Sequence, residues 1–176
     1  RRLPARPTRS ALMTCIVVGG SGQIGHFLLP RLRAAGMAVA AFSRQPRSTT
    51  DGVLWMRGQL PDGIPPLQQS PAAIISLGPL DHFATWLAGA EVQGAPRIVA
   101  MSSMSAESKR DSPDPAERAL AARLRASEQA LLVRANELGC ACTILRATLI
   151  YGTGMDRSLT PLVRFARRWR VFPLPR

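Results

Sequence analysis

The amino-acid sequence predicts an α/β fold of the doubly wound type, in which one parallel β-sheet carries helices on both faces in a single domain. Apolar, β-branched or alanine-rich runs alternate with helical or loop segments along the chain. This alternation is typical of βαβ units. A length of 176 residues suits one domain with a full core, and 46% hydrophobic with 19% charged residues is an ordinary composition for it.

Six runs are predicted strands, and two of the segments between them are clear helices. The first helix covers residues 23–35 and ends before Gly36, with a bend expected at Pro30. The second covers residues 115–138. The predicted strands are residues 14–18, 38–42, 53–56, 72–77, 97–101 and 142–145.

The ends of the 115–138 helix are marked by the residue types found there. Asp114 can cap its N-terminus, Pro115 fits the first position, Glu117 completes a capping box, and Gly139 ends it. One apolar face is expected to lie against the sheet. It consists of Leu120, Leu124, Leu131, Ala135 and Leu138.

Residues 18–25 read VGGSGQIG and follow the first predicted strand directly. Here Gly19 permits a tight turn, Gly22 lets a pyrophosphate approach the backbone, and Gly25 lets helix and strand pack closely. Because a strand precedes the glycines, a helix follows and a second strand starts near Ala38, we predict a dinucleotide-binding turn. The alternative is a glycine-rich turn that binds nothing.

The glycine spacing, G-x-x-G-x-x-G, resembles that of the extended and atypical short-chain dehydrogenase/reductase superfamily, in particular NAD-dependent epimerase/dehydratase-like and NAD(P)-binding proteins. Three further segments carry the resemblance: FSR closing the second strand, VAMSS closing the fifth, and ILRATLIYGTGMD after the sixth. The resemblance implies a Rossmann domain over residues 13–156 that binds NAD(P). Residues 1–12 are expected to be a disordered or non-native extension, and 157–176 a basic helix leading toward a missing or truncated substrate region.

The end of the second predicted strand bears on the choice between NAD and NADP. An NAD site is expected to place an acidic residue about 20 residues after the glycines, to bind the ribose hydroxyls. This chain has Ser43 and Arg44 there, and no acid before Asp51. Arg44, with Arg47 as a second candidate, could bind a 2′-phosphate, so we predict NADP, with NAD less favoured. The alternative is that Arg44 is a solvated loop charge.

The resemblance implies further cofactor contacts. Gln59, in the loop after the third strand, stands where the family often places an Asp against adenine. Tyr151 matches a Tyr-Gly pair that would line the nicotinamide end. The predicted cofactor-binding residues are Gly19, Gly20, Ser21, Gly22, Gln23, Ile24, Gly25, Ser43, Arg44, Gln59, Leu77 and Tyr151.

The family's catalytic Tyr-x-x-x-Lys pair is absent from the 115–138 helix, because the only Tyr is Tyr151 and the only Lys is Lys109. If Glu128 is the acid that usually follows the pair, its two positions hold Leu120 and Leu124.

Ser103 is the one candidate catalytic residue, since it matches a Ser or Thr that contacts a substrate carbonyl. Turn or capping chemistry is its alternative role. Two functions stay open: an NAD(P)-binding protein with weak or no oxidoreductase chemistry, or an NADP-dependent oxidoreductase or epimerase that uses a non-standard acid near Ser103.

The net charge of +12 gathers at the two ends of the sequence, with +4 in residues 1–12 and +5 in 151–176. A nucleic-acid partner is therefore not expected. No apolar run approaches the ~20 residues that span a bilayer, although the basic tail could be a membrane-surface or partner helix.

The three cysteines, an odd number, fit a reducing compartment, and we expect a cytoplasmic protein. Cys140 and Cys142 are expected to be buried strand residues, so no metal is predicted. The expected partners are the dinucleotide and a small-molecule substrate of unknown class, and a homo-oligomer is compatible with the sequence.

Overall fold

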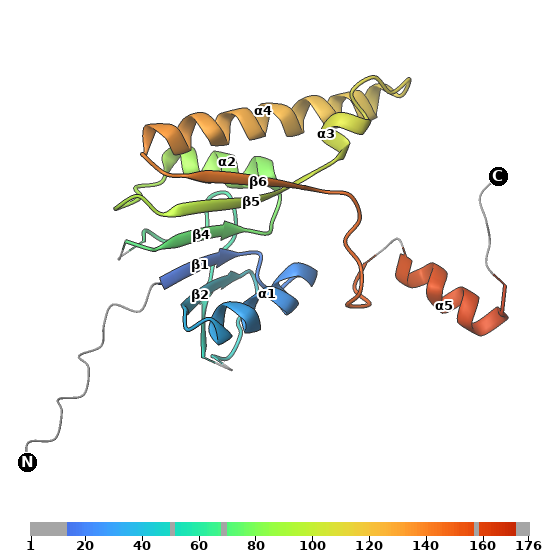
Figure 1. The fold of residues 1–176 in the computed structure, drawn as a ribbon, viewed down its shortest axis with the longest axis horizontal. Helices are drawn as coiled ribbons and strands as arrows, with labels where there is room; N and C mark the ends of the chain where they lie inside the picture. The colour runs from blue at the N-terminus through green and yellow to red at the C-terminus, as the bar shows by residue number, and fades with distance from the viewer. Residues whose placement is uncertain (1–13, 50–51, 68–69, 157–158, 172–176) are drawn as a thin grey trace, which may run out of the picture.

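The computed structural model describes residues 14–49, 52–67, 70–156 and 159–171, which form one sheet of six strands. The strands are β1 (Thr14–Val18), β2 (Ala38–Ser43), β3 (Val53–Arg57), β4 (Ala73–Ser76), β5 (Arg97–Ser103) and β6 (Cys142–Ala147). Every neighbouring pair is parallel, and the order across the sheet is β3-β2-β1-β4-β5-β6 (Figure 1). The predicted parallel sheet is confirmed.

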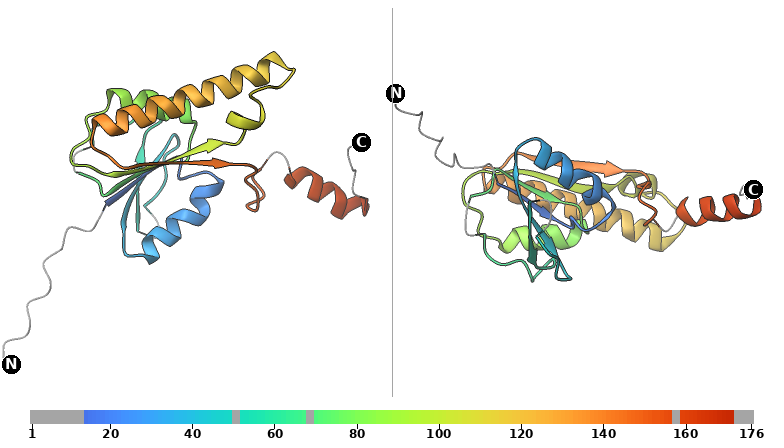
Figure 2. Two further views of the ribbon diagram at one scale, coloured as in Figure 1. Left: turned by 45° about the horizontal axis from the view of Figure 1, so that its top comes forward. Right: turned by 90° about the horizontal axis from the view of Figure 1, so that it is seen from below.

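The helices of the described ranges are α1 (Gln23–Ala34), α2 (Leu80–Gly89), α3 (Ser105–Ser108), α4 (Pro115–Glu137) and α5 (Leu159–Trp169). Three of them, α1, α2 and α4, cover the two faces of the sheet. Figure 2 shows α1 on one face and α2 and α4 on the other. This arrangement confirms the doubly wound α/β prediction.

Alternate side chains of β1 pack into two separate cores. Ile16 and Val18 belong to the larger core, with α2 and α4, whereas Cys15 and Val17 belong to the smaller core, with α1. Successive strand residues point to opposite faces, and these four side chains are at most 5% exposed. The continuous apolar run of β1 therefore suits a strand in the middle of the sheet, covered on both sides.

The chain diverges after the two central strands. It leaves β1 toward α1 on one face and leaves β4 toward α2 on the other. Such a divergence opens a crevice outside the carboxyl ends of the two strands, which is the usual ligand site in open α/β sheets. The glycine turn that follows β1 lies at this place.

Helix α4 has the predicted N-cap but not the predicted capping box. Asp114 Oδ1 accepts the N–H of Ala116 at 2.8 Å. The N–H of Asp114 donates to Ser112 Oγ at 3.2 Å instead of to Glu117. The Glu117 carboxylate accepts hydrogen bonds from Lys109 Nζ and Ser112 Oγ, both at 2.7 Å. A cationic donor competes better for a carboxylate than a backbone N–H does.

The buried face of α4 differs from the predicted one. Leu131 and Ala135 are fully buried as predicted, but Leu120, Leu124 and Leu138 are only half-buried, and in the N-terminal part Ala121 is the fully buried residue. Figure 1 shows the N-terminal part of α4 projecting with α3 past the end of β5. The first turns of α4 therefore have less of the sheet to pack against.

The two ends of the sequence are only partly described. Residues 1–12, expected to be an extension, lie outside the described residues. Within the predicted basic helix at 157–176, residues Leu159–Trp169 form α5, which has no buried residue. None of the helices in the described ranges is long and apolar enough to cross a membrane.

Gly25 sets how closely α1 approaches the glycine turn. A Cβ atom at this position would overlap the carbonyl oxygen of Gly20, so the tight contact is with the turn rather than with the strand as predicted. Gly25→Ala should lower the free energy of unfolding by about 3 kcal/mol, the cost of forcing a methyl group into a close-packed site. Urea unfolding followed by circular dichroism measures this change.

Gly89→Ala, at the end of α2, is the matched control. A Cβ at Gly89 would meet no atom within 4 Å, so the substitution should raise stability by about 0.5–1 kcal/mol through helix propensity. Equal effects of the two substitutions would contradict the tight contact at Gly25.

Candidate functional site

The glycine turn between β1 and α1 is closed by backbone contacts. Gly19 has a φ of +77°, which other residues rarely adopt, and a Cβ there would lie 2.9 Å from the backbone nitrogen of Gly78. The Gly22 N–H donates to the Gly19 carbonyl at 3.1 Å. A Cβ at Gly22 would meet only that carbonyl oxygen within 4 Å, at 3.4 Å. The space beside Gly22 is therefore open to a ligand.

The N-terminus of α1 adjoins this open space without a side-chain cap. Gly22 is its N-cap, and the first turn holds no acidic residue. The first N–H groups of a helix lack acceptors within the helix and carry a partial positive charge. An anion bound beside Gly22 would satisfy them.

A hollow of about 530 Å³, called the crevice below, lies at the carboxyl ends of β1 and β2. Three separate segments line it: the glycine turn, the end of β2 and the loop after β3. It has two basic side chains, Arg44 and His82, and no carboxylate from the described residues. Six predicted cofactor residues line it together: Gly19, Ser21, Gly22, Ser43, Arg44 and Gln59.

The part of the crevice that follows β4 was not predicted from the sequence. Gly78, Pro79 and His82 line it there. The strand order could have revealed them, because β4 lies beside β1 and its following residues must face the glycine turn. The predicted residue in this segment, Leu77, donates its N–H to the Val18 carbonyl at 2.8 Å and packs its side chain against the α1-side core.

The other predicted residues of the glycine segment lie outside the crevice. Gly20 and Gly25 line a second hollow, of about 690 Å³, between α1 and β3, which we call the α1-side hollow. Gln23 Oε1 accepts a hydrogen bond from Thr153 Oγ1 at 3.2 Å. Ile24 is half-buried and lines neither hollow.

The two arginines proposed for a 2′-phosphate lie in different places. Arg44 lines the crevice, whereas the Arg47 guanidinium lies 5.0 Å from the ring centroid of Trp55 and lines the α1-side hollow. A cation over an indole face is electrostatically favourable. Arg57, which is not among the predicted site residues, lines a third hollow together with Arg44.

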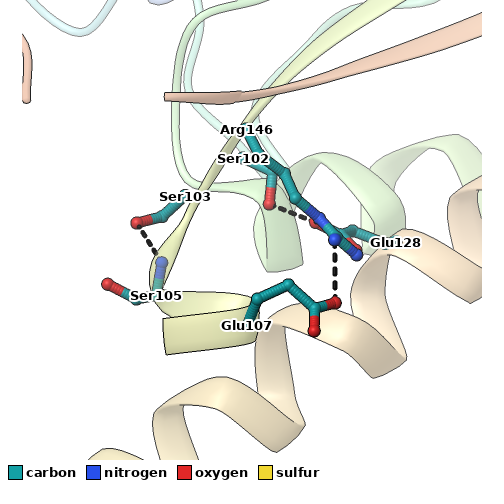
Figure 3. A network of polar contacts seen from close by, with 6 residues as sticks. All are labelled: Ser102, Ser103, Ser105, Glu107, Glu128 and Arg146. Atoms are coloured by element: carbon teal, nitrogen blue, oxygen red, sulfur yellow. Dashed lines mark hydrogen bonds and ion pairs between the residues drawn. The ribbon is translucent and has the colours of Figure 1, made fainter. Parts of the chain in front are cut away.

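Ser103 takes part in a turn at the start of α3 (Figure 3). Its Oγ accepts the N–H of Ser105 at 3.1 Å. This contact is the turn role that the sequence left as the alternative to catalysis. Tyr151, expected at the nicotinamide end, is 64% exposed and lines neither the crevice nor the α1-side hollow.

Beside this turn, the Arg146 side chain of β6 links two helices (Figure 3). Its Nη2 lies 2.6 Å from Glu128 Oε2 of α4, and its Nη1 lies 2.8 Å from Glu107 Oε1 of α3. Ser102 of β5 donates its hydroxyl to Glu128 Oε1 at 2.5 Å. A shared role of Glu128 and Arg146 was not predicted, because their pairing depends on the packing of α4 over β6.

The carboxylate of the Arg146–Glu128 pair is shielded from solvent, since Glu128 is only 6% exposed. The hydrogen bonds from Arg146 lower the pKa of Glu128 below its ordinary value, and Ser102 adds to this effect against the opposing effect of burial. The same pairing raises the pKa of Arg146. Both groups are therefore charged at neutral pH and satisfied by each other.

The two positions that the sequence resemblance assigns to a Tyr and a Lys provide no proton donor, because they hold Leu120 and Leu124. Leu120 and Leu124 lie two turns and one turn before Glu128 on α4. Lys109 is engaged with Glu117, with 2.7 Å between Nζ and Oε1.

The described residues contain no group of three or more His, Cys, Asp or Glu side chains placed to hold a metal ion. Cys140 and Cys142 both pack in the larger core, and burial raises the pKa of each thiol. These two cysteines act as core residues.

The sequence matches no family model and no curated protein. Solved structures match in fold. MoeE5 in complex with UDP-glucose and NAD is 21% identical with a TM-score of 0.64, and the match covers 86% of this chain and 60% of that one. The chain has a Rossmann fold.

Two further structures show the same likeness. A short-chain dehydrogenase/reductase superfamily protein from Agrobacterium tumefaciens with bound NAD is 21% identical, with a TM-score of 0.57 over 76% of this chain and 48% of that one. A UDP-galactose 4-epimerase is 16% identical, with a TM-score of 0.56 over 90% and 64%. This chain thus spans less than two thirds of the length of each of these proteins.

Glu128→Gln should lower the free energy of unfolding by about 2 kcal/mol at pH 7, because Arg146 loses a charged, largely buried acceptor. The folded pKa of Glu128 is lowered from 4.5, so its contribution is complete above that value and is lost as the pH falls through the folded pKa. The stability difference between wild type and variant, measured by urea unfolding, should therefore shrink below pH 4.5.

Glu137→Gln is the matched control. Its pair with Arg134, at 3.1 Å, lies at the surface, so the change should stay below about 0.5 kcal/mol. A wild-type advantage over Glu128→Gln that is constant from pH 7 to pH 3 would contradict the proposed charge pairing.

Proposed function

We propose that this chain is an NAD(P)-binding protein of the atypical or extended short-chain dehydrogenase/reductase superfamily, with weak or no standard oxidoreductase chemistry. The observation that supports it is the crevice, which gathers the glycine turn, the end of β2 and the loop after β3. It lies where the chain diverges from the central strands, the usual nucleotide site of this fold. Two of the structures with this fold contain NAD.

Each part of the crevice suits one part of a dinucleotide. The open space at Gly22 and the uncapped start of α1 suit the pyrophosphate. The Gln59 amide can donate to and accept from an adenine edge, and Arg44 stands beside it for the ribose end. When bound, such a cofactor supplies redox chemistry at its nicotinamide, and the chain binds and orients it.

NADP is our preferred cofactor over NAD. No carboxylate from the described residues lines the crevice, so the ribose hydroxyls lack the acidic partner typical of NAD sites. Arg44 is exposed, and no ion pair joins it to any described residue. A free guanidinium at this place is suited to a phosphate dianion.

Residues 13–156 form the cofactor-binding domain in this proposal, and residues 157–176, including α5, lead toward a substrate region. The three cysteines are free thiols, which is consistent with the proposed cytoplasmic location.

Weak or absent chemistry follows from the side chains near the ends of β5 and β6. Leu120 and Leu124 supply no acid, and the Arg146–Glu128 pair is occupied by its own hydrogen bonds. Ser103 keeps a hydroxyl, but an unassisted hydroxyl is a poor proton donor compared with a phenol beside a lysine. The second candidate function, catalysis through a non-standard acid near Ser103, depends on that hydroxyl.

Gly22→Val should abolish NADPH binding while the protein stays folded. The valine side chain would fill the open space beside the turn, yet its Cβ would make only an ordinary 3.4 Å contact with the Gly19 oxygen. Isothermal calorimetry measures the binding, and circular dichroism checks the fold. Gly89→Val, at a position with no neighbour within 4 Å, should bind as the wild type does. Unchanged affinity in Gly22→Val would place the nucleotide elsewhere.

NADPH oxidation by aldehydes, ketones, quinones or sugar nucleotides should stay below ~1 s⁻¹, the lower end of typical enzyme turnover. A positioned acid raises the rate by about 10²–10⁴-fold, and the two positions that would hold it are Leu120 and Leu124. Absorbance loss at the nicotinamide band provides the measurement. Faster turnover that disappears in Ser103→Ala would instead support the oxidoreductase or epimerase alternative.

A further inference from the structure

Arg57 ends β3 with a guanidinium that no described residue neutralises. It is exposed and makes no ion pair or side-chain hydrogen bond within the described ranges. The acid that follows it, Asp62, lines a different hollow with Pro61 and Trp86. An unpaired cation at a strand end beside the crevice is therefore available to an external anion.

Arg57 and Arg44 line one hollow of about 410 Å³, which we call the arginine hollow. The register of β2 and β3 places Ser43 opposite Arg57, so Arg44 follows directly after that pair. The Gly58 N–H donates to the Ser43 carbonyl at 3.0 Å and continues the pairing beyond the strand. Backbone register thus holds the two arginines at the same edge of the sheet.

The rest of the arginine hollow is formed by Gly58, Gln59 and Gly63. The Gly63 N–H donates to the Gln59 carbonyl at 2.8 Å, and the Gln59 N–H donates to the Gly63 carbonyl at 3.3 Å. A Cβ at Gly58 would lie 2.7 Å from the Gly63 oxygen, and a Cβ at Gly63 would lie 3.0 Å from the Gln59 side chain. The two glycines therefore allow this loop to be compact beside the two arginines.

We infer that Arg57 is a second ligand of the 2′-phosphate of NADP and that it clamps this group together with Arg44. The inference rests on the proposed dinucleotide site, because the arginine hollow adjoins the crevice through Arg44, Gly58 and Gln59, which line both. Two guanidinium groups balance a phosphate monoester, which carries about −1.5 to −2 charges near neutral pH. Arg47, the sequence-based candidate for this role, lies over Trp55 in the α1-side hollow.

The test compares ligands that differ in the 2′-phosphate. Calorimetry would measure the affinities of NADPH, NADH, 2′,5′-ADP and 5′-AMP for the wild type and for Arg57→Gln. The variant should bind NADPH and 2′,5′-ADP about tenfold more weakly, as expected for loss of one charged hydrogen bond. Its affinity for NADH and 5′-AMP should change less than twofold. Arg57→Lys keeps the charge but loses the paired N–H donors of the guanidinium, so its affinity for NADPH should lie between those of the wild type and Arg57→Gln.

Arg97→Gln is the matched control, because Arg97 is an exposed strand arginine at the start of β5, the opposite end of the strands. All four affinities should match the wild type. If the wild type binds neither NADPH nor NADH, the proposed function fails and the inference with it. If it binds both and Arg57→Gln leaves NADPH unchanged, or weakens NADPH and NADH equally, the dinucleotide site stands and the 2′-phosphate clamp is overturned.

Discussion

The close approach of α1 to the glycine turn is the constraint on which the rest of the site depends. Gly25 clears the Gly20 carbonyl only because it has no side chain, and Gly19 adopts a positive φ against Gly78. These contacts direct α1 away from β1 along one face, while α2 leaves β4 along the other. The crevice is the result of that divergence, and the uncapped start of α1 adds a partial positive charge to it.

Arginine charges are neutralised at one edge of the sheet and left without an acidic partner at the other, among the described residues. At the end of β6, Arg146 is neutralised by Glu107 and Glu128, and the cost of withdrawing Glu128 from water is offset by its hydrogen bonds. At the ends of β2 and β3, Arg44 and Arg57 face solvent without a described acidic partner. The first arrangement consolidates the packing of α3 and α4, and the second leaves charge available for a ligand.

Local patterns in the sequence were enough to predict the sheet, because each predicted strand starts within one residue of an observed one. They also gave the N-cap of α4, since Asp114 needs only its neighbours in sequence to form it. The capping box failed because Lys109 and Ser112, which lie before the helix, take the Glu117 carboxylate.

The parts of the site that depend on register and strand order could not be predicted in the same way. Arg57 joins Arg44 only through the pairing of β2 with β3, and His82 reaches the crevice only because β4 lies beside β1. Arg47 was a second candidate for the phosphate because it lies close to Arg44 in the sequence, but the Trp55 ring provides a competing contact.

Strand β6 forms one edge of the sheet. It pairs with β5 on one side, and its other side pairs with no strand among the described residues. Natural edge strands are commonly protected from pairing by an outward charge. Here the charge of Arg146 is already neutralised, and Leu145 beside it is 48% exposed. Compared with β3, whose last residue Arg57 keeps a free charge, the outer edge of β6 is therefore the less protected of the two edges of the described sheet.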